Sequence, residues 1–286
     1  MFFKAFWSSR PLGLSMRFDS CIVRSCIVLA GSKPASSSQV FSYFKYFTNE
    51  HQDTLMSLNY INNARKILCI GRNYAAHIKE LSNATPQQPF FFLKPSSSVL
   101  KPNSGPFLVP RGVVVHHEVE VGIVLNRTLR DLPDSFSNEE ALECIESYAL
   151  TIDMTARNVQ DEAKKKGLPW SIGKGFDTFL PVSHSIAKKD IPDPYKVELS
   201  LSINDKVKQQ DTTDLMLFPI HRILSHMSRI MTLEKGDLIL TGTPKGVGPV
   251  EAGDHVKATL SVDGKVLETI EFDAEQKPGP YEYKEI

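Results

Sequence analysis

The chain has 286 residues, in which 33 Lys and Arg balance 33 Asp and Glu, and 41% of the residues are hydrophobic. The balanced charge argues against a nucleic-acid binder that depends on a basic surface. The composition is that of a folded globular protein and not of a disordered chain. The apolar runs are far shorter than the ~20 residues that span a bilayer, so we expect no membrane span.

The first 55 residues differ in composition from the rest of the chain. They hold six basic and three acidic residues, and up to Thr48 there is a single acid among ten serines. A basic, serine-rich and acid-poor start is typical of a mitochondrial transit segment. Alternatively, the segment is a disordered tail, or it is an upstream extension of the reading frame, in which case Met56 could be the start of translation. We predict a transit or extension segment at 1–55, one folded domain at 56–286, and a mitochondrial location, with the matrix favoured.

From residue 56 onward, the hydrophobic pattern predicts many short strands with few helices between them. Strands are expected at 66–71, 90–93, 113–126, 148–154 and 238–241. Helices are expected at 73–81, 139–147, 155–166 and 218–231. Hairpins are expected at 196–209 and 255–272, and a loop at 96–112. Because helices do not alternate regularly with strands, we predict a single-domain, β-rich α+β fold and not a doubly wound dinucleotide-binding sheet.

The segment 115–122, Val-His-His-Glu-Val-Glu-Val-Gly, carries the strongest chemical signal. On a strand, Glu118 and Glu120 project from the same face. Burying two carboxylates together without a cation would be costly, and a hard divalent cation removes that cost. Asp153 is a third lone acid in an apolar strand. The three acids indicate a metal site, although a solvated edge is the usual explanation for an isolated Glu-x-Glu pair.

Three further segments are candidates for contacts to a substrate. His77 and Glu80 are three residues apart on a predicted helix, where a carboxylate can orient a histidine for proton transfer. Arg157 and Gln160 share a helix face just after Asp153, and Lys174 stands between two glycines. The loop 241–246 offers the Thr243 hydroxyl and backbone N–H groups to an anion. Each has an ordinary alternative: a surface pair, a loop lysine, a plain turn, and for residues 164–166 a solvated run of lysines.

In this order, the segments resemble the fumarylacetoacetate hydrolase superfamily over residues 64–262. The resemblance is carried by short motifs, which are Gly-Arg-Asn-Tyr at 71–74 followed by His77 and Glu80, Phe-Leu-Lys-Pro at 92–95, His-His-Glu-Val-Glu at 116–120, Asp-Met-Thr-Ala-Arg-Asn-Val-Gln at 153–160, Lys-Lys-Gly-Leu-Pro-Trp at 165–170 and Thr-Gly-Thr-Pro-Lys-Gly-Val-Gly at 241–248. The chain is most similar to the mitochondrial branch of that family, which includes acylpyruvate hydrolases, oxaloacetate decarboxylases and the fungal oxaloacetate tautomerases. No G-x-S-x-G, H-E-x-x-H or P-loop motif competes with this interpretation.

The resemblance implies a mixed β-roll or β-sandwich fold, a homodimer and one Mg²⁺ or Mn²⁺ per subunit. The motif match implies that Glu118, Glu120 and Asp153 hold the metal and that His77, Glu80 and Lys174 are catalytic. By the same match, the substrate contacts are Arg72, Lys174, Thr243, Arg157 and Gln160.

The reaction that the resemblance favours is keto–enol tautomerisation of oxaloacetate. A 2-oxo acid can chelate a metal through its carboxylate and 2-oxo oxygen, which favours the enolate. Acylpyruvate hydrolysis and oxaloacetate decarboxylation pass through the same enolate, so the residues leave these alternatives open. A sugar-acid dehydratase or isomerase and a non-catalytic dicarboxylate-binding protein also remain open, although the His77–Glu80 pair favours an enzyme.

Overall fold

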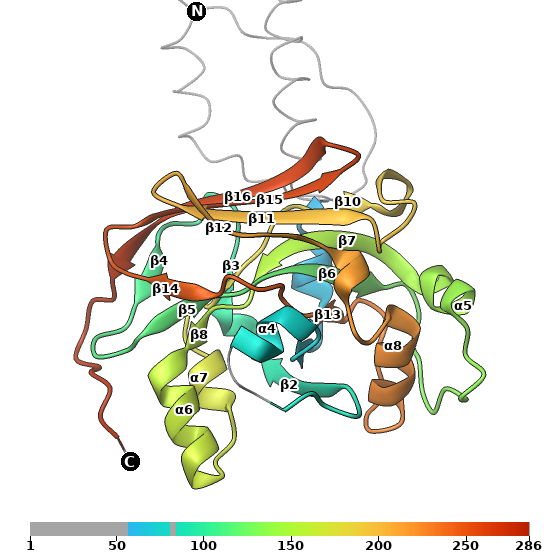
Figure 1. Cartoon of the computed structure of the whole chain (residues 1–286), viewed down its shortest axis with the longest axis horizontal. Helices are drawn as coiled ribbons and strands as arrows, with labels where there is room; N and C mark the ends of the chain where they lie inside the picture. The colour runs from blue at the N-terminus through green and yellow to red at the C-terminus, as the bar shows by residue number, and fades with distance from the viewer. Residues whose placement is uncertain (1–56, 81–83, 286) are drawn as a thin grey trace, which may run out of the picture. The chain divides into compact units, whose positions relative to one another are not determined.

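A computed structural model of the chain describes residues 57–80 and 84–285, which belong to one compact unit (Figure 1). The predicted transit or extension segment at 1–55 lies outside the described residues. No helix in the described part of the chain is long and apolar enough to cross a membrane. Strands predominate over helices, which confirms the predicted α+β class.

A six-stranded mixed sheet carries the centre of the fold, in the order β10-β7-β6-β13-β1-β2. The strands of this sheet are β1 (Ile67–Gly71), β2 (Phe90–Lys94), β6 (Val119–Leu125), β7 (Ile145–Ile152), β10 (Ile186–Ala187) and β13 (Leu238–Leu240). β1 and β13 run parallel, and the other neighbours run antiparallel. All seven residues of β6 are buried, so this strand is covered on both faces.

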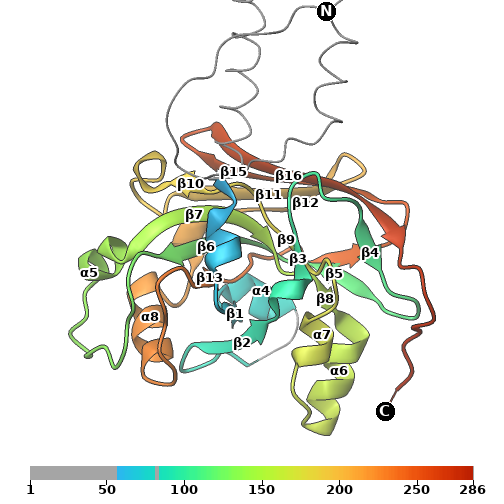
Figure 2. The same ribbon diagram turned by 180° about the vertical axis from the view of Figure 1, so that it is seen from behind.

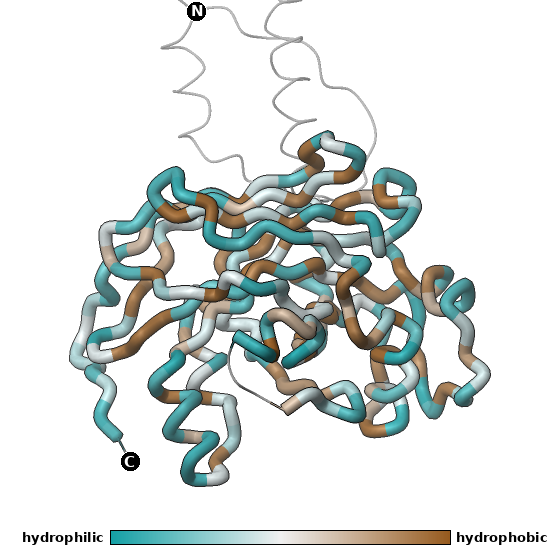
Figure 3. The backbone as a smooth tube through the Cα atoms, in the orientation of Figure 1, coloured by the Kyte–Doolittle hydropathy of each residue, from teal (hydrophilic) through white to brown (hydrophobic). Residues whose placement is uncertain are grey.

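A five-stranded sheet, in the order β12-β11-β15-β16-β4, packs against the first sheet. The strands of the second sheet are β4 (Phe107–Val109), β11 (Val197–Ile203), β12 (Lys206–Thr212), β15 (His255–Val262) and β16 (Lys265–Gln276). Along β11, buried residues alternate with half-exposed ones, as expected when one face is covered. β11 contacts β6 and β16 contacts β7, so the main core lies between the sheets (Figures 1 and 2). Apolar and polar stretches alternate along this outer layer in Figure 3.

Smaller elements surround the two sheets. A three-stranded sheet joins β14 (Gly248–Val250), β5 (Val115–His117) and β8 (Thr155–Ala156), and β3 (Val99–Leu100) pairs with β9 (Leu180–Pro181). The α-helices are α3 (Asn59–Asn63), α4 (Ala75–Glu80), α5 (Asn138–Glu143), α6 (Arg157–Lys166), α7 (Ser171–Lys174) and α8 (Ile220–Ser228). The 3₁₀ turns are η1 (Ser96–Ser98), η2 (Lys188–Asp190) and η3 (Thr213–Leu215).

The predicted strand at 113–126 is wrong in one respect, because the chain leaves one sheet and enters another at Glu118. β5 pairs with β8 and β14, whereas β6 pairs with β7 and β13. The break between β5 and β6 therefore places Glu118 at the junction of the two sheets. No local pattern in the sequence marks this change of partner.

Other predicted boundaries also shift where tertiary pairing overrides local pattern. The helix predicted at 139–147 ends at Glu143, because Ile145 already pairs with Leu125 of β6. Thr155 and Ala156 pair with β5, so the helix predicted at 155–166 begins at Arg157. The loop predicted at 96–112 contains η1, β3 and β4. The remaining predicted elements are present with ends that differ by a few residues.

Candidate active site

Three buried carboxylates meet where the sheets join. Glu118 lies at the break between β5 and β6, Glu120 lies in β6, and Asp153 follows β7. The backbone N–H of Asp153 donates to the carbonyl of Glu118 at 2.8 Å, which holds the ends of the two strands together. One carboxylate oxygen from each acid lies within 4.8 Å of the others. The structure therefore brings together the three acids that the sequence indicates, and it excludes a solvated edge for them.

Basic side chains contact two of these acids directly. Lys174 Nζ lies 2.9 Å from Glu118 Oε2 and 2.6 Å from Asp153 Oδ2. Arg157 Nη2 lies 2.7 Å from Glu118 Oε1. Burial alone would raise the pKa of Glu118, but Lys174 and Arg157 hold that pKa below its ordinary value. In the same way, Asp153 and Glu118 outweigh burial and raise the pKa of Lys174, so its amine carries a proton.

Glu120 is the acid for which the structure gives no basic partner among the described residues. Its Oε2 accepts a hydrogen bond from the backbone N–H of Gly242 at 2.6 Å. Burial, Asp153 and Glu118 raise the pKa of Glu120 well above its ordinary value. Three buried carboxylates with one of them unneutralised form a donor set that suits a hard divalent cation. The residues therefore fit a metal of this type.

The sequence-based site residues do not include Lys94, which the structure places against Asp153. Its Nζ donates to Asp153 Oδ1 at 2.6 Å and to the carbonyl of Met154 at 3.0 Å. The side chain is fully buried at the end of β2. The only signal for Lys94 in the sequence is its place in the Phe-Leu-Lys-Pro motif. No local pattern shows that β2 lies beside the acids.

His77 and Glu80 lie on one face of α4, as predicted. His77 is buried, with Nδ1 3.5 Å from Glu80 Oε2. Burial lowers the pKa of His77 below its ordinary value, so the imidazole is neutral near pH 7. Both carboxylate oxygens of Glu80 accept from the backbone N–H of Gly246 at 3.2 Å, which ties α4 to the loop after β13.

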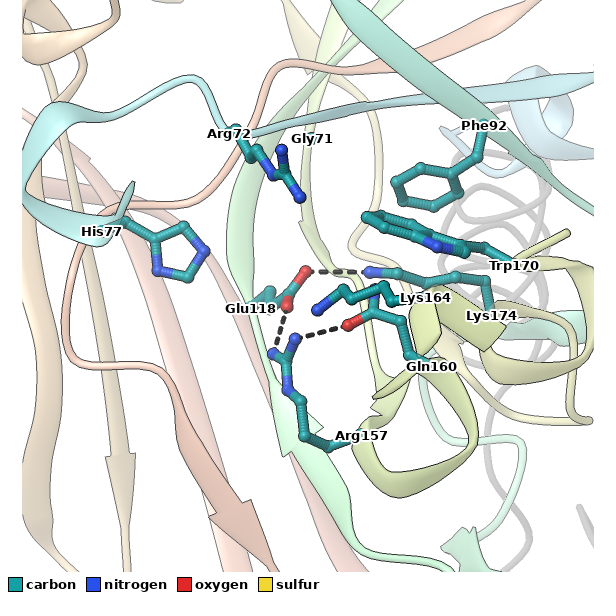
Figure 4. Close-up of a pocket in the computed structure, with 10 residues that line it drawn as sticks. All are labelled: Gly71, Arg72, His77, Phe92, Glu118, Arg157, Gln160, Lys164, Trp170 and Lys174. Atoms are coloured by element: carbon teal, nitrogen blue, oxygen red, sulfur yellow. Dashed lines mark hydrogen bonds and ion pairs between the residues drawn. The ribbon is translucent and has the colours of Figure 1, made fainter. Parts of the chain in front are cut away.

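A small pocket opens beside the acids, and Figure 4 shows its lining. The side chains around it are Arg72, His77, Phe92, Glu118, Arg157, Gln160, Lys164, Trp170 and Lys174. Arg157 Nη1 donates to Gln160 Oε1 at 2.6 Å, which fixes both side chains of α6 at the wall. The predicted residues on α4, α6 and α7 thus face one another, and Lys164 and Trp170 join them without having been predicted.

Thr243 lies behind this pocket and does not line it. Its hydroxyl donates to the carbonyl of Val119 at 2.8 Å and accepts from Gln209 Nε2 at 2.9 Å. The side chain is buried, and in this arrangement it supports the backbone next to Glu118 and Glu120. A direct contact between Thr243 and a substrate stays a prediction.

Gln209 is a second buried residue that sequence reasoning missed. Its Oε1 accepts from the backbone N–H of Val119 at 3.1 Å and lies 2.8 Å from Nδ1 of His117. Its Nε2 donates to Thr243 Oγ1 and to the carbonyl of Pro244, both at 2.9 Å. One amide from β12 therefore holds both residues that flank Glu118 and the loop whose N–H contacts Glu120.

The model of the family described as fumarylacetoacetate (FAA) hydrolase C-terminal matches residues 66–271. The mitochondrial oxaloacetate tautomerase of Saccharomyces cerevisiae is 46% identical, over 80% of this chain and 100% of its own length. The mitochondrial oxaloacetate tautomerase of Schizosaccharomyces pombe is 54% identical, over 70% of this chain and 90% of its own length. A mitochondrial oxaloacetate decarboxylase of Dictyostelium discoideum is 47% identical, over 69% of this chain and 89% of its own length.

Solved structures agree with these sequence relatives. A fumarylacetoacetate hydrolase family protein of yeast superimposes with a TM-score of 0.74 at 45% identity, over 80% of this chain and 100% of that one. The fumarylpyruvate hydrolase of Pseudomonas aeruginosa, solved with Mn²⁺ and pyruvate, gives a TM-score of 0.67 at 30% identity, over 75% and 91%.

Proposed function

This chain belongs to the fumarylacetoacetate hydrolase family, and from that membership we propose that it is a mitochondrial oxaloacetate tautomerase, which converts the enol form of oxaloacetate to the keto form. One observation carries the proposal beyond the names of the relatives: Glu118, which belongs to a buried set of three carboxylates, lines the same pocket as the neutral His77. Folding has buried these charges at a cost, and a catalytic site is a common reason for retaining them.

The metal in this proposal is Mg²⁺ or Mn²⁺, held by Glu118, Glu120 and Asp153. All three offer hard carboxylate oxygens within 4.8 Å of one another. Such a cation would supply positive charge beside the carboxylate and 2-oxygen of a 2-oxo acid. Lys94, Lys174 and Arg157 hold Glu118 and Asp153 in place through ion pairs. The Mn²⁺-containing fumarylpyruvate hydrolase supports this type of metal.

Tautomerisation requires that a proton leave the 2-hydroxyl and that one reach C3. A single base that takes the first proton and returns it to C3 completes the reaction without a net change in its own protonation. We assign this role to His77, which is neutral because burial lowers its pKa, and which Glu80 orients through Nδ1. Figure 4 shows the imidazole directed toward the Glu118 side of the pocket. The protonated Lys174 donates its hydrogen bonds to Glu118, Asp153 and Thr155, so its part in the proposal is to place positive charge beside the developing 2-oxyanion.

The remaining substrate contacts in the proposal are Arg72, Arg157, Gln160 and Thr243. The first three line the pocket in this structure, whereas Thr243 lies outside its lining, with its hydroxyl donating to the carbonyl of Val119. The enzyme is proposed to be a homodimer, as the family resemblance implies.

A second candidate function is decarboxylation of oxaloacetate or hydrolysis of an acylpyruvate. The relative named as an oxaloacetate decarboxylase and the structure named as a fumarylpyruvate hydrolase support it. The two candidates are separated by assaying the purified chain with Mg²⁺ on enol-oxaloacetate and acetylpyruvate. Loss of enol absorbance, CO₂ release and C–C cleavage are followed in parallel. Tautomerisation should exceed the other two rates, and a faster release of CO₂ or pyruvate would favour the second candidate.

The His77 assignment is tested with His77→Ala, and Glu80→Gln serves as the matched milder change. His77→Ala should lower turnover by roughly 10²- to 10⁴-fold, the usual worth of a positioned acid or base. Calorimetry should show oxalate binding nearly intact, because oxalate needs the metal end of the site and no proton transfer. Normal turnover by His77→Ala would refute the assignment, and loss of oxalate binding would indicate a structural role.

The proposed transit segment is tested by fusing residues 1–55 to a fluorescent reporter. Because this segment is basic and nearly free of acids, the reporter should enter mitochondria. A reporter that stays in the cytosol would favour translation from Met56.

A further inference from the structure

The three lysines at the end of α6 are all exposed, but only Lys164 lines the pocket. Lys164 lines the pocket, and its side chain is 30% exposed. Lys165 is exposed and does not line it, and Lys166 pairs with Glu162 at 2.7 Å. Since the helical period turns each successive lysine by about 100°, only the first can face the site.

Two contacts hold Lys164 at the mouth of the pocket. Its Nζ lies 5.5 Å from the centroid of the Trp170 ring, within the range of a cation–π interaction. Its ion pair is with Asp161, one turn earlier on α6, at 3.2 Å. Asp161 is 59% exposed, and a pair of this kind contributes little in water. The ammonium group can therefore exchange Asp161 for an anion inside the pocket at small cost.

Arg72 lines the same pocket from another element. It stands between β1 and α4 with φ 61°, in the left-handed region that side chains rarely adopt. Its guanidinium makes no hydrogen bond or ion pair with the residues that the structure describes. Figure 4 shows the Arg72 and Lys164 side chains extending into the pocket from different sides.

The charges at the wall do not balance. Arg157 and Lys174 are engaged with Glu118, whereas Arg72 and Lys164 have no buried carboxylate partner in the described part of the chain. Burial is the main cause that lowers the pKa of Lys164, Asp161 opposes this effect, and the nearby Arg157 and Arg72 lower the pKa further. A ligand with a second negative charge would relieve this repulsion, and a ligand with a neutral tail would not.

We propose that Lys164, with Arg72, binds the second carboxylate of a dicarboxylic 2-oxo acid and so selects such acids over 2-oxo acids with uncharged tails. This inference rests on the proposed function, because it places the reacting end of the substrate at Glu118 and Lys174. Lys164 and Lys174 approach the pocket from α6 and α7, so one molecule can contact both. Lys164 is then a determinant of substrate class and not part of the proton transfer.

The test measures binding of malate and oxalate in the presence of Mg²⁺ by calorimetry. Malate carries carboxylates at both ends of a four-carbon chain, whereas oxalate occupies the metal end alone. Lys164→Met should weaken the binding of malate roughly 10- to 100-fold, which is the contribution of a charge-assisted hydrogen bond. The affinity for oxalate should change less than about twofold. Lys164→Arg should restore part of the malate affinity. Lys165→Met, which removes an equal charge one residue away, is the matched control and should behave as the unmodified chain.

Turnover provides the second readout. Lys164→Met should lower the ratio of kcat/KM for oxaloacetate to that for acetylpyruvate by roughly 10- to 100-fold, mainly through KM. Unchanged malate affinity, equal losses for malate and oxalate, or equal effects of Lys164→Met and Lys165→Met would each overturn the inference. If the chain binds malate through Lys164 but does not tautomerise oxaloacetate, the proposed function fails while this inference stands.

Discussion

The buried acids of the pocket and an exposed set of charges on β15 and β16 have nearly the same spacing. Around the buried acids, ion pairs of 2.6–2.9 Å join side chains that are at most 11% exposed. On the outer sheet, His255 lies 2.7 Å from Asp273 and 3.1 Å from Glu271, and Lys257 lies 3.2 Å from Glu271. Those four side chains are 42–76% exposed. Water screens the second set, so distance alone does not tell which charges matter.

The largest difference in stability between the two regions is expected when one aspartate in each is replaced by alanine. Asp153→Ala leaves Lys94 and Lys174 buried without their shared carboxylate, which should cost about 3–5 kcal/mol in the free energy of unfolding. It should also abolish activity. Asp273→Ala removes an exposed partner of His255 and should cost less than about 1 kcal/mol. Urea denaturation and turnover measure both, and equal losses for the two variants would contradict the comparison.

Removal of a divalent cation by a chelator should also affect the buried acids and not the exposed charges. If the three acids bind a divalent cation, EDTA should remove activity and lower the Tm of the unmodified chain, because a bound ligand stabilises the folded state. The Tm of Glu120→Ala should then respond little to Mg²⁺, whereas that of Glu271→Ala should respond as fully as the unmodified chain. Full activity after chelation would be inconsistent with a metal at these acids.

Substitutions of the neighbouring residues Gln209 and Gln210 should have smaller effects, which are measured on Mg²⁺ affinity. Gln209→Leu removes the amide that joins Val119 and His117 to the loop at Thr243, and should weaken Mg²⁺ binding roughly 10- to 100-fold. Gln210 contacts Glu198 on the exposed side of the sheet, so Gln210→Leu should leave metal affinity within about twofold. Titration calorimetry with Mg²⁺ measures both. Equal affinities for the two variants would show that Gln209 does not position Glu118.

The smallest effect is expected at His255, and it should depend on pH. The hydrogen bond to Asp273 is the main cause that raises the pKa of His255 above its ordinary value. A raised pKa in the folded state means that the contribution is complete below the unfolded-state pKa of about 6.5 and disappears as pH rises through the folded-state pKa. Relative to the unmodified chain, the free energy of unfolding of His255→Gln, measured by urea denaturation, should therefore be lower by less than about 1 kcal/mol at pH 5.5 and unchanged at pH 9. A larger loss at pH 9 than at pH 5.5 would reverse the expected sign.

The sequence is sufficient for features that depend on residue type and short spacing. Glu118, Glu120 and Asp153 stand out because an acid in an apolar strand is unusual, and His77 and Glu80 because a helix brings positions three apart together. The fold class follows from the excess of strands over helices. These inferences need no knowledge of which strand pairs with which.

The parts that the sequence did not reveal depend on distant pairing. Lys94 meets Asp153 across 59 positions, and Gln209 meets Val119 across 90. The break at Glu118 exists because β5 and β6 have partners in different sheets. Lys164 belongs to a charged run that is ordinarily solvated, and only the placement of α6 beside Trp170 turns it toward the pocket. Local propensity carries no information on any of these contacts.

The parallel pairing of β1 with β13 has a consequence for how the molecule folds. β1 is the first described strand and β13 begins 171 positions later, at Leu238, while Gly242 contacts Glu120 across 122 positions. Closing such long loops precedes any gain from the contacts, so we expect slow folding with a high contact order. A chain that has emerged only as far as α8 would expose the edges of β1 and β6 that β13 later covers. The contact of Glu120 with the loop after β13 therefore forms late, after nearly the whole chain is available.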